Sequence, residues 1–180
     1  MTNVLLAAGA SVALYKACDL ASQLTQAGHA VRTVLTPNAA ELVNPQLFEA
    51  VSGEPAFVDE FSEDRQGAMD HIELAEWAGL FLVAPASADL IARLALGLAG
   101  DLVGTVSLAL PAGTPRLLCP AMNPNMLAAP ALQRHLETLA GDGWELVEPG
   151  EGHMACGVAG KGRLAEPEQI LARVQDLAAG

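Results

Sequence analysis

Two serines in this sequence stand where an anion could be bound. Ser11 and Ser87 each follow a run of apolar residues and precede a helical pattern. The unpaired backbone N–H groups of a helix N-terminus, together with a hydroxyl, can hold a phosphate. A serine at this place is also a common N-cap that needs no ligand. The pair favours a phosphate-bearing ligand, although neither segment matches a P-loop or a full G-x-G-x-x-G pattern.

A histidine at position 71 is the first candidate for acid–base chemistry. His71 lies between a polar stretch and a short amphipathic segment, and an imidazole can act as a general base near neutral pH. Composition alone favours a surface or helix-capping role for a lone histidine. The other histidines are His29, His135 and His153, and no pair has the spacing of metal ligands. We therefore expect no metal site.

The most unusual stretch is Pro-Ala-Met-Asn-Pro-Asn-Met, from Pro120 to Met126. It follows an apolar run and offers an amide and two thioethers, which suits the rim of a ligand site. Asn123 could donate and accept hydrogen bonds with a substrate carboxylate or amide. It could also cap the next helix, with Pro124 in the first turn and the methionines as core residues. Both interpretations can hold together.

A third kind of chemistry is indicated near the C-terminus. Cys156 lies in a glycine-rich stretch close to Lys161 and Arg163, which are the clustered basic residues of the chain. A thiol near cations is more readily ionised and more reactive. Cys18 and Cys119 fall in helix and strand patterns instead. A buried small hydrophobic residue remains the alternative for Cys156.

Apolar runs alternate with amphipathic stretches along the chain, and this order must position the candidate residues. The expected strands cover residues 3–8, 30–35, 80–84, 116–119 and 144–147, and the expected helices cover 12–27, 44–51, 87–96, 125–140 and 166–178. Such alternation is typical of a doubly wound α/β domain, a mostly parallel sheet with helices on both faces. Ligands of these sheets bind beyond the carboxyl ends of the strands. Residues 149–162 read as an irregular stretch that could form a flap.

Composition excludes several classes of function. The 180 residues fit one domain, and 52% hydrophobic against 17% charged residues excludes global disorder. A net charge of -12 argues against nucleic acid and anionic membranes as partners. No apolar run reaches membrane-spanning length, and no basic segment of a signal peptide precedes the first apolar run. The odd number of cysteines does not suggest a framework of disulfides. We therefore expect a cytoplasmic protein with reduced thiols.

Taken in order, these stretches resemble the flavin-dependent cysteine decarboxylases over nearly the whole chain. The shared motifs are Ser-Val-Ala-Leu-Tyr-Lys ending at Lys16, His-Ile-Glu-Leu from His71, Pro-Ala-Ser-Ala-Asp-Leu from Pro85, Pro-Ala-Met-Asn ending at Asn123 with Met126, and Ala-Cys-Gly from Ala155 with Gly-Lys-Gly-Arg ending at Arg163. The last two are the most specific, because other flavoproteins share the first and third.

The resemblance implies a single Rossmann-like domain over residues 1–180, without a fused synthetase domain. It further implies FMN as cofactor and a homo-oligomer, a trimer or a dodecamer built of trimers, with active sites between subunits. The implied flavin contacts are Gly9, Ala10, Ser11, Thr36, Ser87, Ala88, Asp89, Leu90, Ala121 and Met122. The implied substrate-binding residues are Asn123, Met126, Lys161 and Arg163, and the implied catalytic residues are His71 as base and Cys156 as late proton donor.

The branch of the family that it resembles most converts phosphopantothenoylcysteine to phosphopantetheine in coenzyme A biosynthesis. The implied reaction oxidises the cysteine thiol to a thioaldehyde, releases carbon dioxide and reduces the resulting enethiol. No side chain offers the electron sink that decarboxylation needs, so a cofactor must supply it. Decarboxylation of a peptidyl cysteine and a non-catalytic FMN-binding regulator are the alternatives. One departure is Ala10, where the family usually has glycine and this chain has its glycine one place earlier, at Gly9.

Overall fold

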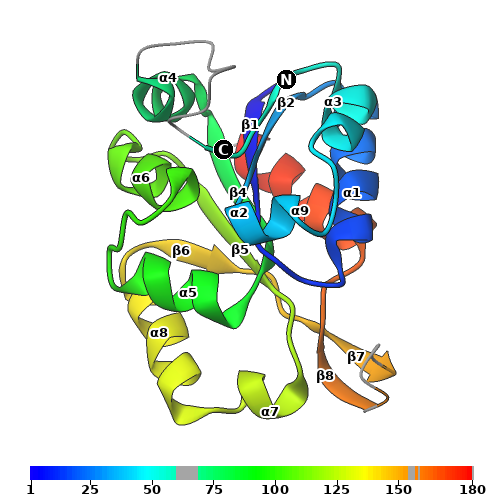
Figure 1. Cartoon of the computed structure of the whole chain (residues 1–180), viewed down its shortest axis with the longest axis vertical. Coiled ribbons are helices and arrows are strands. Elements are labelled where there is room, and N and C mark those ends of the chain that lie inside the picture. The colour runs from blue at the N-terminus through cyan, green and yellow to red at the C-terminus, as the bar shows by residue number, and fades with distance from the viewer. Residues whose placement is uncertain (60–68, 154–156, 158, 180) are drawn as a thin grey trace.

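The computed structural model describes residues 1–59, 69–153, 157 and 159–179. Its centre is a six-stranded sheet in the order β3-β2-β1-β4-β5-β6, with every neighbouring pair parallel (Figure 1). The strands are β1 (Asn3–Ala8), β2 (Ala30–Leu35), β3 (Ala56–Phe57), β4 (Leu80–Ala86), β5 (Arg116–Pro120) and β6 (Trp144–Leu146). The chain moves outward from β1 in one direction and then from β4 in the other, so the predicted doubly wound α/β domain is confirmed.

Helices cover both faces of this sheet because every central strand is buried on both sides. They are α1 (Leu14–Gln26), α2 (Pro37–Ala40), α3 (Gln46–Ser52), α4 (Asp70–Trp77), α5 (Ala88–Ala95), α6 (Leu102–Ala109), α7 (Pro124–Leu127), α8 (Pro130–Gly141) and α9 (Pro167–Ala179). In β1, Val4 and Leu6 join the core under α1, α3 and α9, while Leu5 and Ala7 join the core under α4, α5, α6 and α8. This alternation of side chains fixes the register of the sheet.

The stretch 149–162, predicted to be irregular, instead contains most of an antiparallel hairpin. Strands β7 (Gly150–His153) and β8 (Ala159–Arg163) pair with each other and not with the main sheet. In Figure 1 the hairpin and α7 lie at the end of the molecule to which the carboxyl ends of the parallel strands point. The backbone N–H of Met122 donates to the carbonyl of Gly162 at 2.9 Å, which ties the loop after β5 to the hairpin.

The single helix predicted over residues 125–140 was also wrong. Two helices, α7 and α8, occupy this region, and prolines at positions 124 and 130 stand at the first helical turns. A proline lacks the N–H that a continuing helix needs, so Pro130 ends one helix and begins the next. Within the described ranges, no helix combines the length and the apolar run that a membrane crossing requires.

Candidate functional site

Four strand ends place a hydroxyl or an amide at the carboxyl edge of the sheet. Ser87 caps α5 by accepting from the Leu90 N–H at 3.3 Å, as predicted. Thr36, which is 3% exposed, caps α2 in the same way. Asn123 caps α7, because its Oδ1 accepts from the N–H of Asn125 at 2.8 Å. These residues therefore have a structural role whether or not a ligand is bound.

The fourth, Ser11, does not cap α1 as the sequence suggested. The helix begins at Leu14 with Ala13 in the cap position, and no side chain caps it. Ser11 Oγ accepts from the Ala13 N–H at 3.2 Å, which closes a turn between β1 and the helix. The serine thus stands two residues further from the helix than predicted.

The turn after β1 depends on Gly9. Its N–H donates to the carbonyl oxygen of Pro85 at 2.9 Å. A Cβ on Gly9 would lie 2.9 Å from that oxygen and 3.0 Å from Leu90 Cδ2, closer than such atoms approach each other. Ala10, by contrast, is half-buried. The close approach between β1 and β4 therefore needs a glycine at position 9, where this chain has it.

A cavity of about 500 Å³ opens beside this edge. Its walls come from the turn after β1 with the start of α1, the loop after β5 and the hairpin strands. Of the predicted site residues, the cavity is lined by Ser11, Ala121, Met122, Asn123 and Arg163. The cavity brings together three predicted flavin-binding residues (Ser11, Ala121 and Met122) and two predicted substrate-binding residues (Asn123 and Arg163), from segments up to 152 positions apart in the sequence (11 to 163).

Among the lining residues that were not predicted as site candidates, three carry polar side chains. Tyr15 and Lys16 reach the cavity wall from α1, and His153 reaches it from β7. Tyr15 and Lys16 end the shared motif Ser-Val-Ala-Leu-Tyr-Lys, and this motif could have identified them as site residues. His153 had no such signal, because it gains its position only through the hairpin.

Several predicted residues lie elsewhere. Asp89 is exposed and pairs with Arg93 at 3.0 Å, and Leu90 is fully buried in the core. Met126 is 49% exposed on α7. Gly9, Ala10, Thr36, Ser87 and Ala88 lie at the strand ends but do not line the cavity. Cys156 lies outside the described residues.

His71 is also separate from the cavity. It is the second residue of α4 and is half-buried. Figure 1 shows α4 at the opposite end of the molecule from α7, whose cap is Asn123. A single chain therefore does not bring His71 and Asn123 together.

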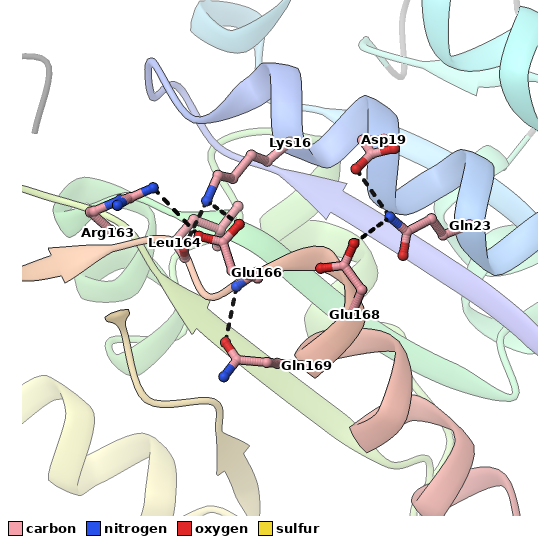
Figure 2. Close-up of polar contacts among 8 residues, drawn as sticks. All are labelled: Lys16, Asp19, Gln23, Arg163, Leu164, Glu166, Glu168 and Gln169. Carbon is pink, nitrogen blue, oxygen red and sulfur yellow. Dashed lines mark hydrogen bonds and ion pairs between the residues drawn. The ribbon is translucent and has the colours of Figure 1, made fainter. Parts of the chain in front are cut away.

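Two cations, Lys16 and Arg163, give the cavity wall local positive charge (Figure 2). Lys16 has a side chain only 10% exposed, and its Nζ donates to Glu166 Oε2 at 2.7 Å and to the Leu164 carbonyl at 3.5 Å. Arg163 Nη2 donates to the other oxygen of Glu166 at 3.4 Å. Lys161, predicted to act beside Arg163, instead pairs with Glu148, and this hydrogen bond raises the pKa of its ammonium.

The two described thiols are unsuited to chemistry at neutral pH. Cys18 and Cys119 are both buried, and burial raises the pKa of each thiol because the thiolate is poorly solvated there. Neither lines the cavity. A reactive thiolate is therefore not expected from either residue.

Comparison with known proteins extends over nearly the whole chain. Residues 1–179 match the model of the Flavoprotein family. The bifunctional coenzyme A biosynthesis protein CoaBC of Bacillus subtilis is 44% identical over 169 residues, which are 94% of this chain and 41% of that protein. The chain thus spans about two fifths of the length of such relatives.

Other similar proteins match from end to end. A probable phosphopantothenoylcysteine decarboxylase of Streptococcus mutans is 38% identical, and the match covers 97% of this chain and 97% of that protein. A solved structure of a PPC decarboxylase mutant complexed with pantothenoylaminoethenethiol superposes with a TM-score of 0.87 at 30% identity, covering 99% of both chains. The FMN-dependent cysteine decarboxylase SpaF gives 0.84 at 29% identity, covering 99% of this chain and 98% of SpaF. The chain belongs to the Flavoprotein family, whose model matches it from residue 1 to residue 179.

Proposed function

We propose that this protein is an FMN-dependent decarboxylase that converts phosphopantothenoylcysteine to phosphopantetheine in coenzyme A biosynthesis. The observation that carries this proposal is the position of Asn123. Its Pro-Ala-Met-Asn loop stands at the carboxyl edge of the sheet, and its side chain lines a cavity together with Arg163. The end-to-end similarity to a probable decarboxylase of this substrate supports the same reaction.

The strand ends suit a flavin mononucleotide. Gly9 leaves no space for a side chain, so the backbone of the turn packs directly on β4. Hydroxyls of Ser11, Thr36 and Ser87 and the N-terminus of α5 would hold the single phosphate without a basic surface. When bound, the flavin would supply the two-electron oxidation and re-reduction that no side chain can perform.

The chain's own residues would bind substrate and move protons. The side-chain amide of Asn123 carries N–H donors in addition to the oxygen that caps α7, so it can donate to a carboxylate or carbonyl of the substrate. Arg163 adds a charged donor on the same wall. His71 would accept the proton of the first step, and Cys156 would return a proton at the last.

The separation of His71 from the cavity favours a homo-oligomer whose sites lie between subunits. We infer a trimer, or a dodecamer built of trimers, in which α4 of one copy completes the cavity of the next. Mixed oligomers of His71→Asn and Asn123→Asp, each nearly inactive alone, should regain about a quarter of wild-type activity if subunits mix at random. No recovery in mixed oligomers, with mixing verified by mass, would contradict an inter-subunit site.

The reaction itself is tested with purified protein loaded with FMN. Carbon dioxide and phosphopantetheine should form from phosphopantothenoylcysteine, and a cysteine-ending peptide should react more slowly. Asn123→Asp keeps an oxygen for the cap of α7 but loses the amide donor, so kcat/KM should fall by about 100-fold. Asn125→Asp changes an exposed side chain two residues away and is the matched control. A flavin-loaded protein that forms no product would refute the proposal.

A further inference from the structure

One carboxylate beside the cavity is shared by two cations. Glu166 precedes α9, and its two oxygens accept separately from Lys16 Nζ at 2.7 Å and from Arg163 Nη2 at 3.4 Å (Figure 2). Lys16 and Arg163 line the cavity, whereas Glu166 does not. The carboxylate therefore holds both cations without itself occupying the cavity wall.

The position of Glu166 is fixed by the start of α9. Its backbone N–H donates to Gln169 Oε1 at 3.1 Å, and the Gln169 N–H donates back to the Glu166 carbonyl at 2.9 Å. Such reciprocal bonds define the first turn of a helix. Helix α9 contributes Ile170 and Val174 to the same core as α1, so the carboxylate is held at a set distance from Lys16.

The two ion pairs differ in strength. The ammonium of Lys16 is nearly buried, and a cation in that setting requires a counter-charge. Arg163 is 38% exposed and makes the longer contact. Its guanidinium lies over Gly152 in the hairpin, where a Cβ would come within 2.9 Å of Nη1. A ligand anion can therefore take donors of Arg163 while Lys16 stays paired.

We propose that Glu166 is a positioning residue that stays paired with Lys16 and holds Arg163 at the cavity wall, so that Arg163 can receive an anionic group of the substrate. This inference rests on the proposed function and adds the residues that select an anionic substrate. Phosphopantothenoylcysteine carries two such groups, a phosphate and the cysteine carboxylate, and both are recognised by the same charge-assisted hydrogen bonds.

The test compares Glu166→Gln with Glu168→Gln in the FMN-loaded protein. Glu168 is an exposed neighbour that accepts a hydrogen bond from Gln23 and does not line the cavity. In Glu166→Gln, KM should rise about tenfold while kcat changes little, because binding and not chemistry is weakened. If KM rises for phosphopantothenoylcysteine but not for pantothenoylcysteine, the bound group is the phosphate. If KM rises equally for both substrates, the bound group is the cysteine carboxylate. An unchanged KM, or the same change in Glu168→Gln, overturns the proposal.

A double-mutant cycle separates positioning from simple loss of stability. If Glu166 acts through Arg163, the double variant Glu166→Gln/Arg163→Gln should bind no more weakly than Arg163→Gln alone. Independent, additive losses would overturn the proposal. Should Glu166→Gln fail to fold, Arg163→Gln alone must show the same rise in KM, or the proposal fails.

Calorimetric titration with inorganic phosphate provides a readout that does not need turnover. The wild-type protein should bind phosphate about tenfold more tightly than Glu166→Gln. A wild-type protein without turnover would refute the proposed function, whereas equal phosphate affinity in the two proteins would refute the role of Glu166. The two failures are therefore distinguishable.

Discussion

Replacing Gly9 by alanine should destabilise the protein, because the added methyl group has no space. The new Cβ would lie 2.9 Å from the Pro85 carbonyl oxygen, which belongs to the backbone of β4 and cannot rotate away. Overpacking of this kind costs about 1–3 kcal/mol, and weakening the Gly9 to Pro85 hydrogen bond adds about 1 kcal/mol. The lower entropy of the unfolded alanine chain offsets about 0.4–1 kcal/mol. The net loss is then about 1–3.5 kcal/mol.

For a domain of this size that loss corresponds to a fall in Tm of about 2–14 °C. Thermal unfolding followed by circular dichroism measures it, with Gly100→Ala as the matched control. Gly100 is exposed, and no atom lies within 4 Å of the position that an added methyl group would take, so the same substitution should leave Tm unchanged or slightly raised. If both variants melt at the same temperature, steric crowding between β1 and β4 is not what requires a glycine at this turn.

Two further predictions concern titrating groups. In the native protein the thiol of Cys156 should react rapidly with a disulfide reagent. Cys18 and Cys119 should react only on unfolding, because both are buried and burial raises the pKa of each thiol. A fast phase that persists in Cys156→Ser would contradict this prediction. Burial lowers the pKa of His29, which is 8% exposed, so its neutral form stabilises the fold above the unfolded pKa of about 6.5. Stability should fall as pH drops from there through the folded pKa, and His29→Gln should lose less Tm between pH 7.5 and pH 5 (roughly spanning that range) than the wild type.

The central strands could be predicted from sequence because burial on both faces leaves a continuous apolar run. Residues 3–8 and 30–35 were predicted with the bounds that β1 and β2 have. Helix α6 was missed for the opposite reason. Its sequence LVGTVSLA is apolar around the whole circumference, so it shows no helical period, and its cap Asp101 precedes no amphipathic pattern. Strand β3 has two residues, too few for any period.

The hairpin could not be predicted because its strands contain glycine and polar residues without apolar alternation. Gly152 pairs with Gly160, and a Cβ on Gly160 would lie 2.9 Å from Pro124 Cγ. Glycine is thus used in β8 to let the strand approach α7 closely, a requirement that exists only in the folded molecule. His153 pairs with Ala159 in the hairpin and lines the cavity, so its position depends on a fold that gave no signal in the sequence.

Lys16 shows the limit of spacing arguments at the candidate site. Its neighbours on α1, Ala17 and Leu20, are buried, and a lysine among them reads as a helix residue whose charge reaches solvent. Its partner Glu166 is 150 positions away, and only the packing of α9 on α1 brings the two together. The net charge of -12 gives no indication of this ion pair either, because it is a sum over the whole sequence and does not show where cations lie. Charge at a cavity is decided by which few groups face it, and at this one Lys16 and Arg163 face it while their carboxylate does not.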